Sequence, residues 1–294
     1  MIEVIAPGPY ATVQDLGRPG YAHLGVPHSG AADAASLRLA NRLVGNPEGD
    51  AGIELTLGGA RLRFTAGAWV AVTGARCPVE LVTTGSPDGP APRIRAVGQC
   101  APFWAAAGAE LRVGTPATGL RTYVAVRGGV ETPAVMGSRS TDSLSGLGPA
   151  PLRAGATLPV GPTAALPPII VDAAPPPAAP PGTLRVLPGP RDDWFVPGAL
   201  ATLCAQPYRV SQDSNRVGVR LEGALLERAR GGELPSEGMV AGALQVPPDG
   251  RPIVFLADHP TTGGYPVIAV LASADLAAAA QLRPGDRVRF RVGR

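Results

Sequence analysis

The sequence has 294 residues, of which 45% are hydrophobic, and a formal net charge of +3 at pH 7. Glycine and proline are abundant, with 39 and 34 residues, but the apolar share is high enough to build a core, which favours a turn-rich globular protein over a disordered chain. All 26 basic side chains are arginines. Because a phosphate-binding P-loop and a Schiff-base enzyme both need a lysine amine, the composition excludes these two classes.

Several partners and compartments are also disfavoured. The arginines are scattered singly and aromatic residues make up only 4% of the chain, so we expect no nucleic-acid binding. Three widely spaced cysteines, Cys77, Cys100 and Cys204, form neither a disulfide framework nor a metal knuckle, which suits a reducing compartment. The N-terminus shows no export signal and proline interrupts the charge-free stretches. We therefore expect a cytoplasmic protein that does not enter a membrane.

Short strand-like runs dominate the chain, and only two segments have a helical pattern. The first predicted helix covers 33–44, with Asp33 as N-cap and Gly45 at its end, and the second covers 274–281, with Ser273 as N-cap. Many short strands with few helices predict a mainly β protein built as barrels or sandwiches. The predicted strands, in chain order, are 61–65, 68–73, 78–83, 120–127, 253–257, 267–271 and 287–292.

One segment is a candidate domain boundary. Residues 167–182 are rich in proline and carry a single charge, Asp172, so they are expected to form an extended spacer. This predicts an N-terminal β-rich half, 1–166, a linker, 167–182, and a C-terminal β-barrel half, 183–294.

The loop at 25–33 places an imidazole, a hydroxyl and a carboxylate beside a predicted helix N-terminus, where free backbone N–H groups attract anions. His28, Ser29 and Asp33 are therefore candidate functional residues. The alternative is that Ser29 and Asp33 only cap the helix. The histidines are too dispersed for a metal site to be expected.

A second candidate group lies at 137–142, where Arg139 is flanked by hydroxyls that include Ser140. Arginine beside Ser or Thr can bind a carboxylate or phosphate through two hydrogen bonds. A plain surface turn has the same composition.

A third candidate is Glu237, between Ser236 and Gly238, which could act as a general base if its loop is partly desolvated. Isolated acids in loops are more often simply solvated.

The fourth group follows a buried strand-like run, an arrangement that holds polar loop residues on a rigid element. Asp258 and His259 offer acid–base capacity. The glycines allow close approach of a ligand, although the same residues also make a good turn. The remaining candidates in this loop are Thr261, Thr262, Gly263, Gly264 and Tyr265.

Several short sequence motifs, which follow one another along nearly the whole chain, resemble those of the biotin-dependent carboxyltransferase-like family. This family is also called the allophanate hydrolase subunit 2 family, and it includes one of the subunits of 5-oxoprolinase. Examples are Gly-Val-Pro-x-Ser-Gly-Ala-x-Asp at 25–33, where x marks a position outside the match, Gly-Ser-Arg-Ser-Thr at 137–141 and Thr-Thr-Gly-Gly-Tyr-Pro at 261–266. The other matching stretches are 12–18, 40–46, 216–223, 236–238, 245–247 and 284–290.

The resemblance implies a cyclophilin-like β-barrel architecture and a non-autonomous subunit of an ATP-dependent 5-oxoprolinase, inactive alone, that opens the lactam 5-oxoproline to glutamate. It implies a subunit-1-type partner and a third lactam-utilisation subunit. Because the chain lacks lysine, we expect ATP to be bound mainly by a partner, and biotin could be carried only by another protein.

Two other functions remain open. One is a carboxyltransferase component of a urea carboxylase or amidolyase-like system acting on an amide, and the other is a regulatory protein that neutralises an inhibitor of a sensor kinase. For the enzyme, hydroxyls and backbone amides at Ser29, Ser140 and 261–265 would orient the substrate, Arg139 would bind a carboxylate, and Glu237, Asp258 or His28 would handle a proton. Val267 stands where the family often has a basic residue, which leaves the substrate open.

Overall fold

The computed structural model describes residues 1–83, 93–176, 182–232 and 234–293. They pack into two compact units, neither of which is one continuous stretch. The first, here called the sandwich unit, comprises Met1–Arg18, Asp33–Thr141 and Gly146–Ala178. The second, the barrel unit, comprises Pro19–Ala32, Asp142–Ser145 and Ala179–Arg294. Short segments at 19–32 and 142–145 thus belong with the C-terminal strands, whereas the prediction drew the boundaries as consecutive stretches.

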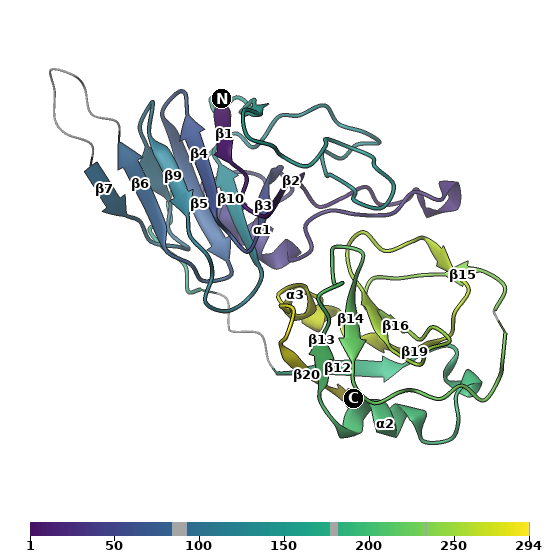
Figure 1. The fold of residues 1–294 in the computed structure, drawn as a ribbon. Helices are drawn as coiled ribbons and strands as arrows, with labels where there is room; N and C mark the ends of the chain where they lie inside the picture. Colours follow the sequence, from purple (N-terminus) through teal and green to yellow (C-terminus); the bar gives the residue numbers. More distant parts are fainter. Residues whose placement is uncertain (84–92, 177–181, 233, 294) are drawn as a thin grey trace, which may run out of the picture. The chain divides into compact units, whose positions relative to one another are not determined.

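The sandwich unit has two sheets, of six and five strands, which Figure 1 shows in purple to teal. Apolar side chains from both sheets share one core, for example Leu62 and Leu111 from the first and Ile53 and Val72 from the second. The six-stranded sheet contains, in spatial order, β11 (Thr157–Leu158), β1 (Ile2–Ala6), β4 (Ala60–Phe64), β9 (Glu110–Val113), β6 (Val79–Thr83) and β7 (Arg93–Ala96); the five-stranded sheet contains β2 (Tyr10–Gln14), β3 (Gly52–Thr56), β10 (Arg121–Val126), β5 (Ala68–Gly74) and β8 (Phe103–Ala105).

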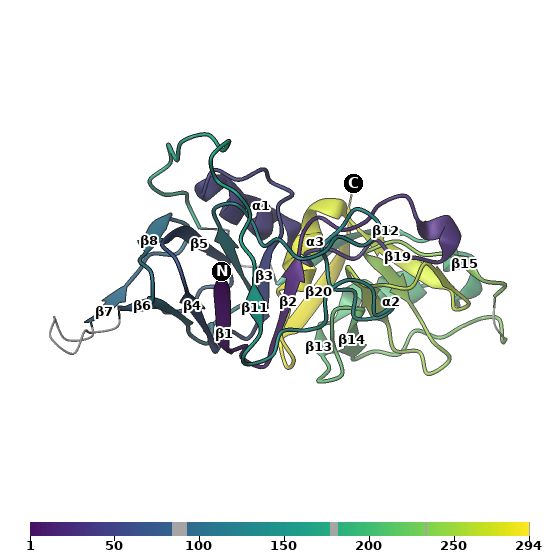
Figure 2. The ribbon, with the colours of Figure 1, turned by 90° about the horizontal axis from the view of Figure 1, so that it is seen from above.

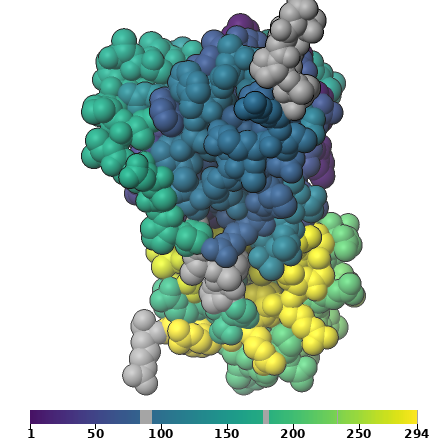
Figure 3. All heavy atoms as spheres, turned by 90° about the vertical axis from the view of Figure 1, so that its left-hand side faces the viewer, coloured from purple at the N-terminus to yellow at the C-terminus, as the bar shows by residue number. Residues whose placement is uncertain are grey.

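Helix α1 (Ala34–Leu43) packs on β5 and β10 of the sandwich unit. It begins where predicted, because the Asp33 side chain accepts hydrogen bonds from the backbone N–H of Ser36 at 3.0 Å and from its hydroxyl at 2.7 Å. Gly45 follows the helix with φ +70°. In the space-filling view of Figure 3, residues from the middle of this unit's sequence, in blue, make up much of its visible face.

The barrel unit is a closed barrel. Its core includes Leu184, Tyr208, Val254, Ile268 and Phe290. In order around the barrel the strands are β12 (Thr183–Pro188), β19 (Val267–Leu271), β16 (Ala243–Gln245), β17 (Ile253–Phe255), β14 (Gly218–Glu222), β13 (Tyr208–Val210) and β20 (Arg287–Val292). The pair that closes it, β12 with β20, is parallel, and the other pairs are antiparallel.

A two-stranded ribbon of β15 (Glu237–Gly238) and β18 (Thr262–Gly263) also belongs to the barrel unit. Figures 1 and 2 both show the short turn η1 (Ala22–Leu24) near β15. The remaining elements of this unit are η2 (Asp192–Trp194), α2 (Ala199–Ala205), η3 (Ser273–Asp275) and α3 (Leu276–Ala280).

The mainly β class is confirmed, and every predicted strand overlaps an observed one. The prediction of Ser273 as N-cap is wrong: Ser273 begins η3, and the residue before α3 is Asp275, whose side chain makes no capping bond. Helix α2 has no counterpart in the prediction. Residues 177–181 of the predicted linker lie outside the described residues, while Ala174 donates a backbone hydrogen bond to Cys100 within the sandwich unit.

No helix among the described residues has the length and apolar character needed to cross a bilayer.

Candidate functional site

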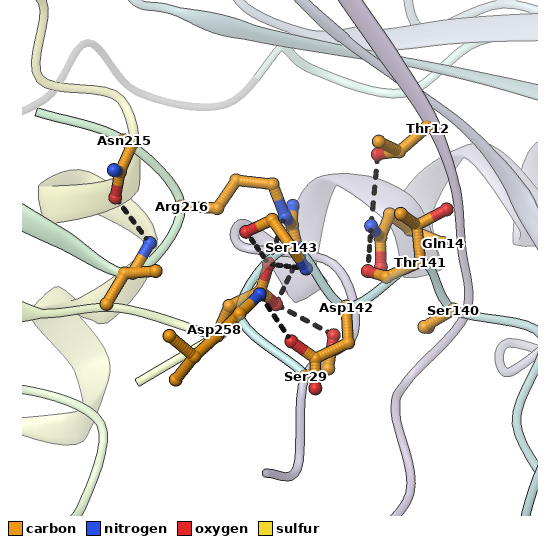
Figure 4. A network of polar contacts seen from close by, with 12 residues as sticks. Thr12, Gln14, Ser29, Ser140, Thr141, Asp142, Ser143, Asn215, Arg216 and Asp258 are labelled. Carbon is orange, nitrogen blue, oxygen red and sulfur yellow. Dashed lines mark hydrogen bonds and ion pairs between the residues drawn. The ribbon is translucent and has the colours of Figure 1, made fainter. Parts of the chain in front are cut away.

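Asp258 lies in the turn after β17, and its carboxylate is fully buried. The Arg216 guanidinium donates to both oxygens, from Nε to Oδ2 at 2.9 Å and from Nη2 to Oδ1 at 3.1 Å. Ser29 Oγ donates to Oδ1 at 2.7 Å, and Ser143 donates to Oδ2 from its backbone N–H at 3.0 Å and from its hydroxyl at 2.6 Å. Figure 4 shows these side chains converging on the carboxylate.

These contacts determine the ionisation of Asp258. Burial by itself raises the pKa of this carboxyl, but the charge and hydrogen bonds of Arg216, with the hydrogen bonds of Ser143, outweigh it and hold the pKa below its ordinary value. A carboxylate with a lowered pKa and donors on both oxygens is a poor proton acceptor at neutral pH. The proton-handling role predicted for Asp258 therefore does not fit its environment, which is that of a structural anion.

The candidate residues in the loop at 25–33, which are Ser29, His28 and Asp33, have different surroundings. Ser29 is buried, has a left-handed backbone with φ 55°, and commits its hydroxyl to Asp258. His28 is exposed. Asp33 accepts two hydrogen bonds from Ser36 in the sandwich unit. This is the arrangement expected if Asp33 caps the helix, which was the alternative to a functional role. His28 is thus the predicted residue of this loop that reaches solvent.

His259 follows Asp258 and is 8% exposed. One ring nitrogen, Nδ1, lies 2.8 Å from the carbonyl oxygen of Pro260. Burial lowers the pKa of the imidazole, the Pro260 carbonyl opposes this, and the nearby charge of His28 lowers it further. His259 is therefore neutral at pH 7, and a neutral imidazole that donates from Nδ1 keeps an acceptor at Nε2.

The ribbon of β15 and β18 brings two predicted motifs together. Glu237 pairs with Gly263, and Gly238 pairs with Thr262. The Met239 backbone N–H donates to the Thr261 carbonyl at 2.9 Å. Motifs more than twenty residues apart thus form one surface.

Two further residues complete this ribbon. Gln245 Nε2 donates to the Tyr265 carbonyl at 3.1 Å, and the Leu234 backbone N–H donates to the Gly264 carbonyl at 2.9 Å. All five predicted residues at 261–265 therefore lie on or directly beside the ribbon.

Glu237 forms an ion pair that the sequence analysis missed. Arg191 Nε donates to both carboxylate oxygens at 2.8 and 3.1 Å, and Nη2 also bonds Oε1. The hydrogen bond from Arg191 is the main cause that lowers the pKa of Glu237; burial opposes it and the Arg191 charge adds to it. Glu237 is thus ionised at neutral pH and orients Arg191. The position of Arg191, directly after a strand and a Pro-Gly-Pro turn and at the start of the charged run Arg-Asp-Asp, is the signal that could have identified it.

Arg139 and Ser140 lie within the sandwich unit, around Asp15. The Ser140 and Ser138 hydroxyls and the Arg139 backbone N–H all donate to the Asp15 carboxylate. The Arg139 guanidinium lies 3.8 Å from Glu131. Ser140 is buried, and its hydroxyl binds Asp15 within the turn. These surroundings do not support the predicted contact of Ser140 with a substrate.

Within the described ranges, no group of three or more His, Cys, Asp and Glu side chains could hold a metal ion.

Comparison with known proteins identifies the family. The model of the family described as "Carboxyltransferase domain, subdomain A and B" matches residues 24–292. The chain belongs to the carboxyltransferase-domain family. This family membership confirms the resemblance seen in the motifs.

Two curated relatives of this carboxyltransferase domain differ in length. The chain is 36% identical to the C subunit of 5-oxoprolinase from Escherichia coli, with 99% of this chain and 90% of that protein covered. It is 35% identical to urea amidolyase of Lachancea kluyveri, with 98% of this chain but only 17% of that protein covered.

Solved structures give the same family. The crystal structure of TTHA0988 matches with a TM-score of 0.85 and 37% identity over 99% of this chain, which spans 55% of that chain. Urea amidolyase of K. lactis matches with a TM-score of 0.85 and 32% identity over 99% of this chain and 18% of the other. The chain thus spans about half of the first of these proteins and less than a fifth of the second.

Proposed function

We propose that this chain is a subunit of an ATP-dependent 5-oxoprolinase, contributing a substrate pocket and an interface to a subunit-1-type partner. The observation that carries the proposal is the match to 90% of the length of the 5-oxoprolinase C subunit, compared with 17% of urea amidolyase. A lactam-utilisation protein would complete the complex.

The chemistry explains why several subunits would be needed. Opening a lactam requires an electrophilic carbonyl, which ATP can provide by phosphorylating the carbonyl oxygen with release of ADP. Water then adds to the carbon, the C–N bond breaks to free the amine and leave an acyl phosphate, and a second water releases phosphate and the carboxylate. No lysine is available in this chain to bind the triphosphate, so the ATP site is assigned to a partner.

This chain would bind and orient the lactam at the ribbon of β15 and β18. The ribbon gathers a fixed carboxylate at Glu237, a partly exposed guanidinium at Arg191 and the amide of Gln245. The buried ion pair of Asp258 would hold the neighbouring loops in place rather than react. His28 remains a candidate for proton transfer because it is exposed.

The test is reconstitution of the chain with its subunit-1-type partner and the lactam-utilisation protein. We expect glutamate to be released from 5-oxoproline with one ADP formed per glutamate, and neither product when this chain is left out or tested alone. The absence of glutamate from the full mixture, with every protein folded and assembled, would refute the proposal.

The similarity to urea amidolyase supports a second candidate, a carboxyltransferase component acting on urea or a related amide. It differs in needing a biotinylated carrier protein, because this chain has no lysine to which biotin could be attached. Carboxylation of urea that depends on such a carrier, without ATP-linked release of glutamate from 5-oxoproline, would favour it.

A further inference from the structure

The inference starts from the Arg191 side chain, which is 39% exposed. Its Nε and Nη2 atoms are occupied by the Glu237 carboxylate, which fixes the plane of the guanidinium. The third nitrogen, Nη1, has no hydrogen-bond partner among the residues that the structure describes. Since a guanidinium has five N–H donors, Arg191 retains donors for another anion. A guanidinium held on one side by a carboxylate is already oriented before a second anion arrives, which reduces the entropy cost of binding it.

The strand opposite Glu237 leaves room for Gln245. A Cβ atom at Gly263 would lie 2.6 Å from Gln245 Nε2 and 3.3 Å from Met239, so the absence of a side chain lets the amide pack against the ribbon. Gln245 is 6% exposed, and its Nε2 is held by the Tyr265 carbonyl. No residue in the described part of the chain donates to Gln245 Oε1. A buried amide usually satisfies both of its polar atoms, so Oε1 is an acceptor suited to an N–H donor from a ligand.

We propose that Arg191 binds the carboxylate, and Gln245 Oε1 accepts the amide N–H, of one small lactam acid at the ribbon. Glu237 is then a positioning residue, which acts by holding Arg191. Glu237, which Arg191 binds, is the register partner of Gly263, and the Gln245 amide packs against Gly263, so the two groups lie beside the same pair of ribbon residues. This inference rests on the proposed function and specifies which side chains recognise the substrate.

The assignment replaces Arg139 as the carboxylate-binding residue. The Arg139 guanidinium lies 3.8 Å from Glu131, and its backbone N–H is bound to Asp15. Arg191 instead combines a guanidinium oriented by Glu237, available donors and the Gln245 acceptor beside the same ribbon.

The experiment measures binding of 5-oxoproline to the assembled complex by calorimetry without ATP, so that turnover does not enter. Arg191→Gln is compared with Arg209→Gln, which removes an exposed arginine from β13 of the same unit, and with Arg139→Gln. Arg191→Gln is expected to weaken binding at least about tenfold, whereas the other two change it less than about twofold. Arg191→Lys should recover part of the loss, because it restores the charge but not the planar donors.

A second ligand tests whether Arg191 recognises the carboxylate of the substrate. The same lactam ring without a carboxylate, 2-pyrrolidone, should bind wild type more weakly than 5-oxoproline, and Arg191→Gln should not weaken it further. Unchanged binding of 5-oxoproline by Arg191→Gln, an equal loss in Arg139→Gln, or no binding of 5-oxoproline by the folded wild-type complex would each overturn the inference. Binding that depends on Arg191 in a complex that releases no glutamate with ATP would refute the proposed function alone.

Discussion

At the scale of single residues, two carboxylates of the barrel unit have different surroundings although both are paired with arginine. Asp258 is enclosed, with donors on both oxygens, whereas Glu237 and its partner Arg191 are partly exposed. Removing one partner of a buried ion pair leaves a buried charge uncompensated, whereas a partly exposed pair can keep its partner and still contact a ligand. We therefore expect Asp258 to act on stability and Glu237 on substrate binding.

Replacing Asp258 by Asn should destabilise the chain by about 3–5 kcal/mol, because it leaves the Arg216 charge buried without its partner. Urea unfolding at pH 7 measures the loss. The matched control is Asp213→Asn, which changes an exposed aspartate of the same unit and should shift stability by less than about 0.5 kcal/mol.

The loss should also depend on pH. Because the pKa of Asp258 is lower in the folded state, its stabilisation is fully present above the ordinary value of 3.8 and disappears as the pH falls through the folded pKa. The difference between wild type and Asp258→Asn should therefore shrink under acid conditions. A difference that is small at pH 7, or that grows on acidification, would contradict the role assigned to Asp258.

At the scale of elements, the N-cap of α1 can be tested directly, because a single side chain, Asp33, forms it. Asp33→Ala removes the acceptor for Ser36 and should lower the free energy of unfolding by about 1 kcal/mol. Asp33→Ser keeps a capping oxygen and should retain most of the stability. Thermal unfolding of the two variants side by side tests the cap, and equal losses would show that the side-chain acceptor is not what matters.

The ribbon provides a matched pair of glycines on opposite strands. An added Cβ at Gly263 would meet Gln245 Nε2 at 2.6 Å, whereas at Gly238 it would meet nothing within 4 Å. Gly263→Ala should displace the Gln245 amide and weaken 5-oxoproline binding at least about tenfold, while Gly238→Ala should leave it nearly unchanged. Calorimetry on the assembled complex distinguishes them, and equal affinities for the two variants would show that the Gln245 amide does not need this position.

The elements themselves were largely predictable, because they are encoded by local pattern. The alternation of arginine and apolar residues at 287–292 coincides with β20 (Arg287–Val292), and the Asp33 cap marks the start of α1. Helix α2 escaped prediction because its seven residues carry no capping side chain.

The candidate site was predictable only in part, because its contacts join residues far apart in the chain. Arg191 and Glu237 are separated by 46 positions, and Ser29 and Asp258 by 229. Local pattern identified Glu237 and the residues at 261–265, but not that a ribbon pairs them. It also could not distinguish a buried structural carboxylate at Asp258 from a reactive one, since burial is set by the fold.

At the scale of the whole molecule, the chain does not complete one unit before starting the next. Segments 19–32 and 142–145 leave the sandwich unit in sequence and belong to the barrel unit, where Ser29, Gly30 and Ser143 bond to Asp258 and Arg216. The barrel unit is therefore incomplete in residues 183–294 alone, and Asp258 is the point at which the added segments are held.

The parallel seam between β12 and β20 bears on how this protein is made in a cell. Among the barrel strands, β12 is synthesised first and β20 last, more than a hundred residues later. β12 therefore cannot form its pairing with β20 until synthesis is nearly finished. During that interval the nascent sheet exposes unpaired backbone at its margins, a condition under which chains associate with one another. Slowing translation upstream of residue 287 would prolong that exposure, so yield during expression should depend on codon choice and chaperone supply more than the stability of the finished protein suggests.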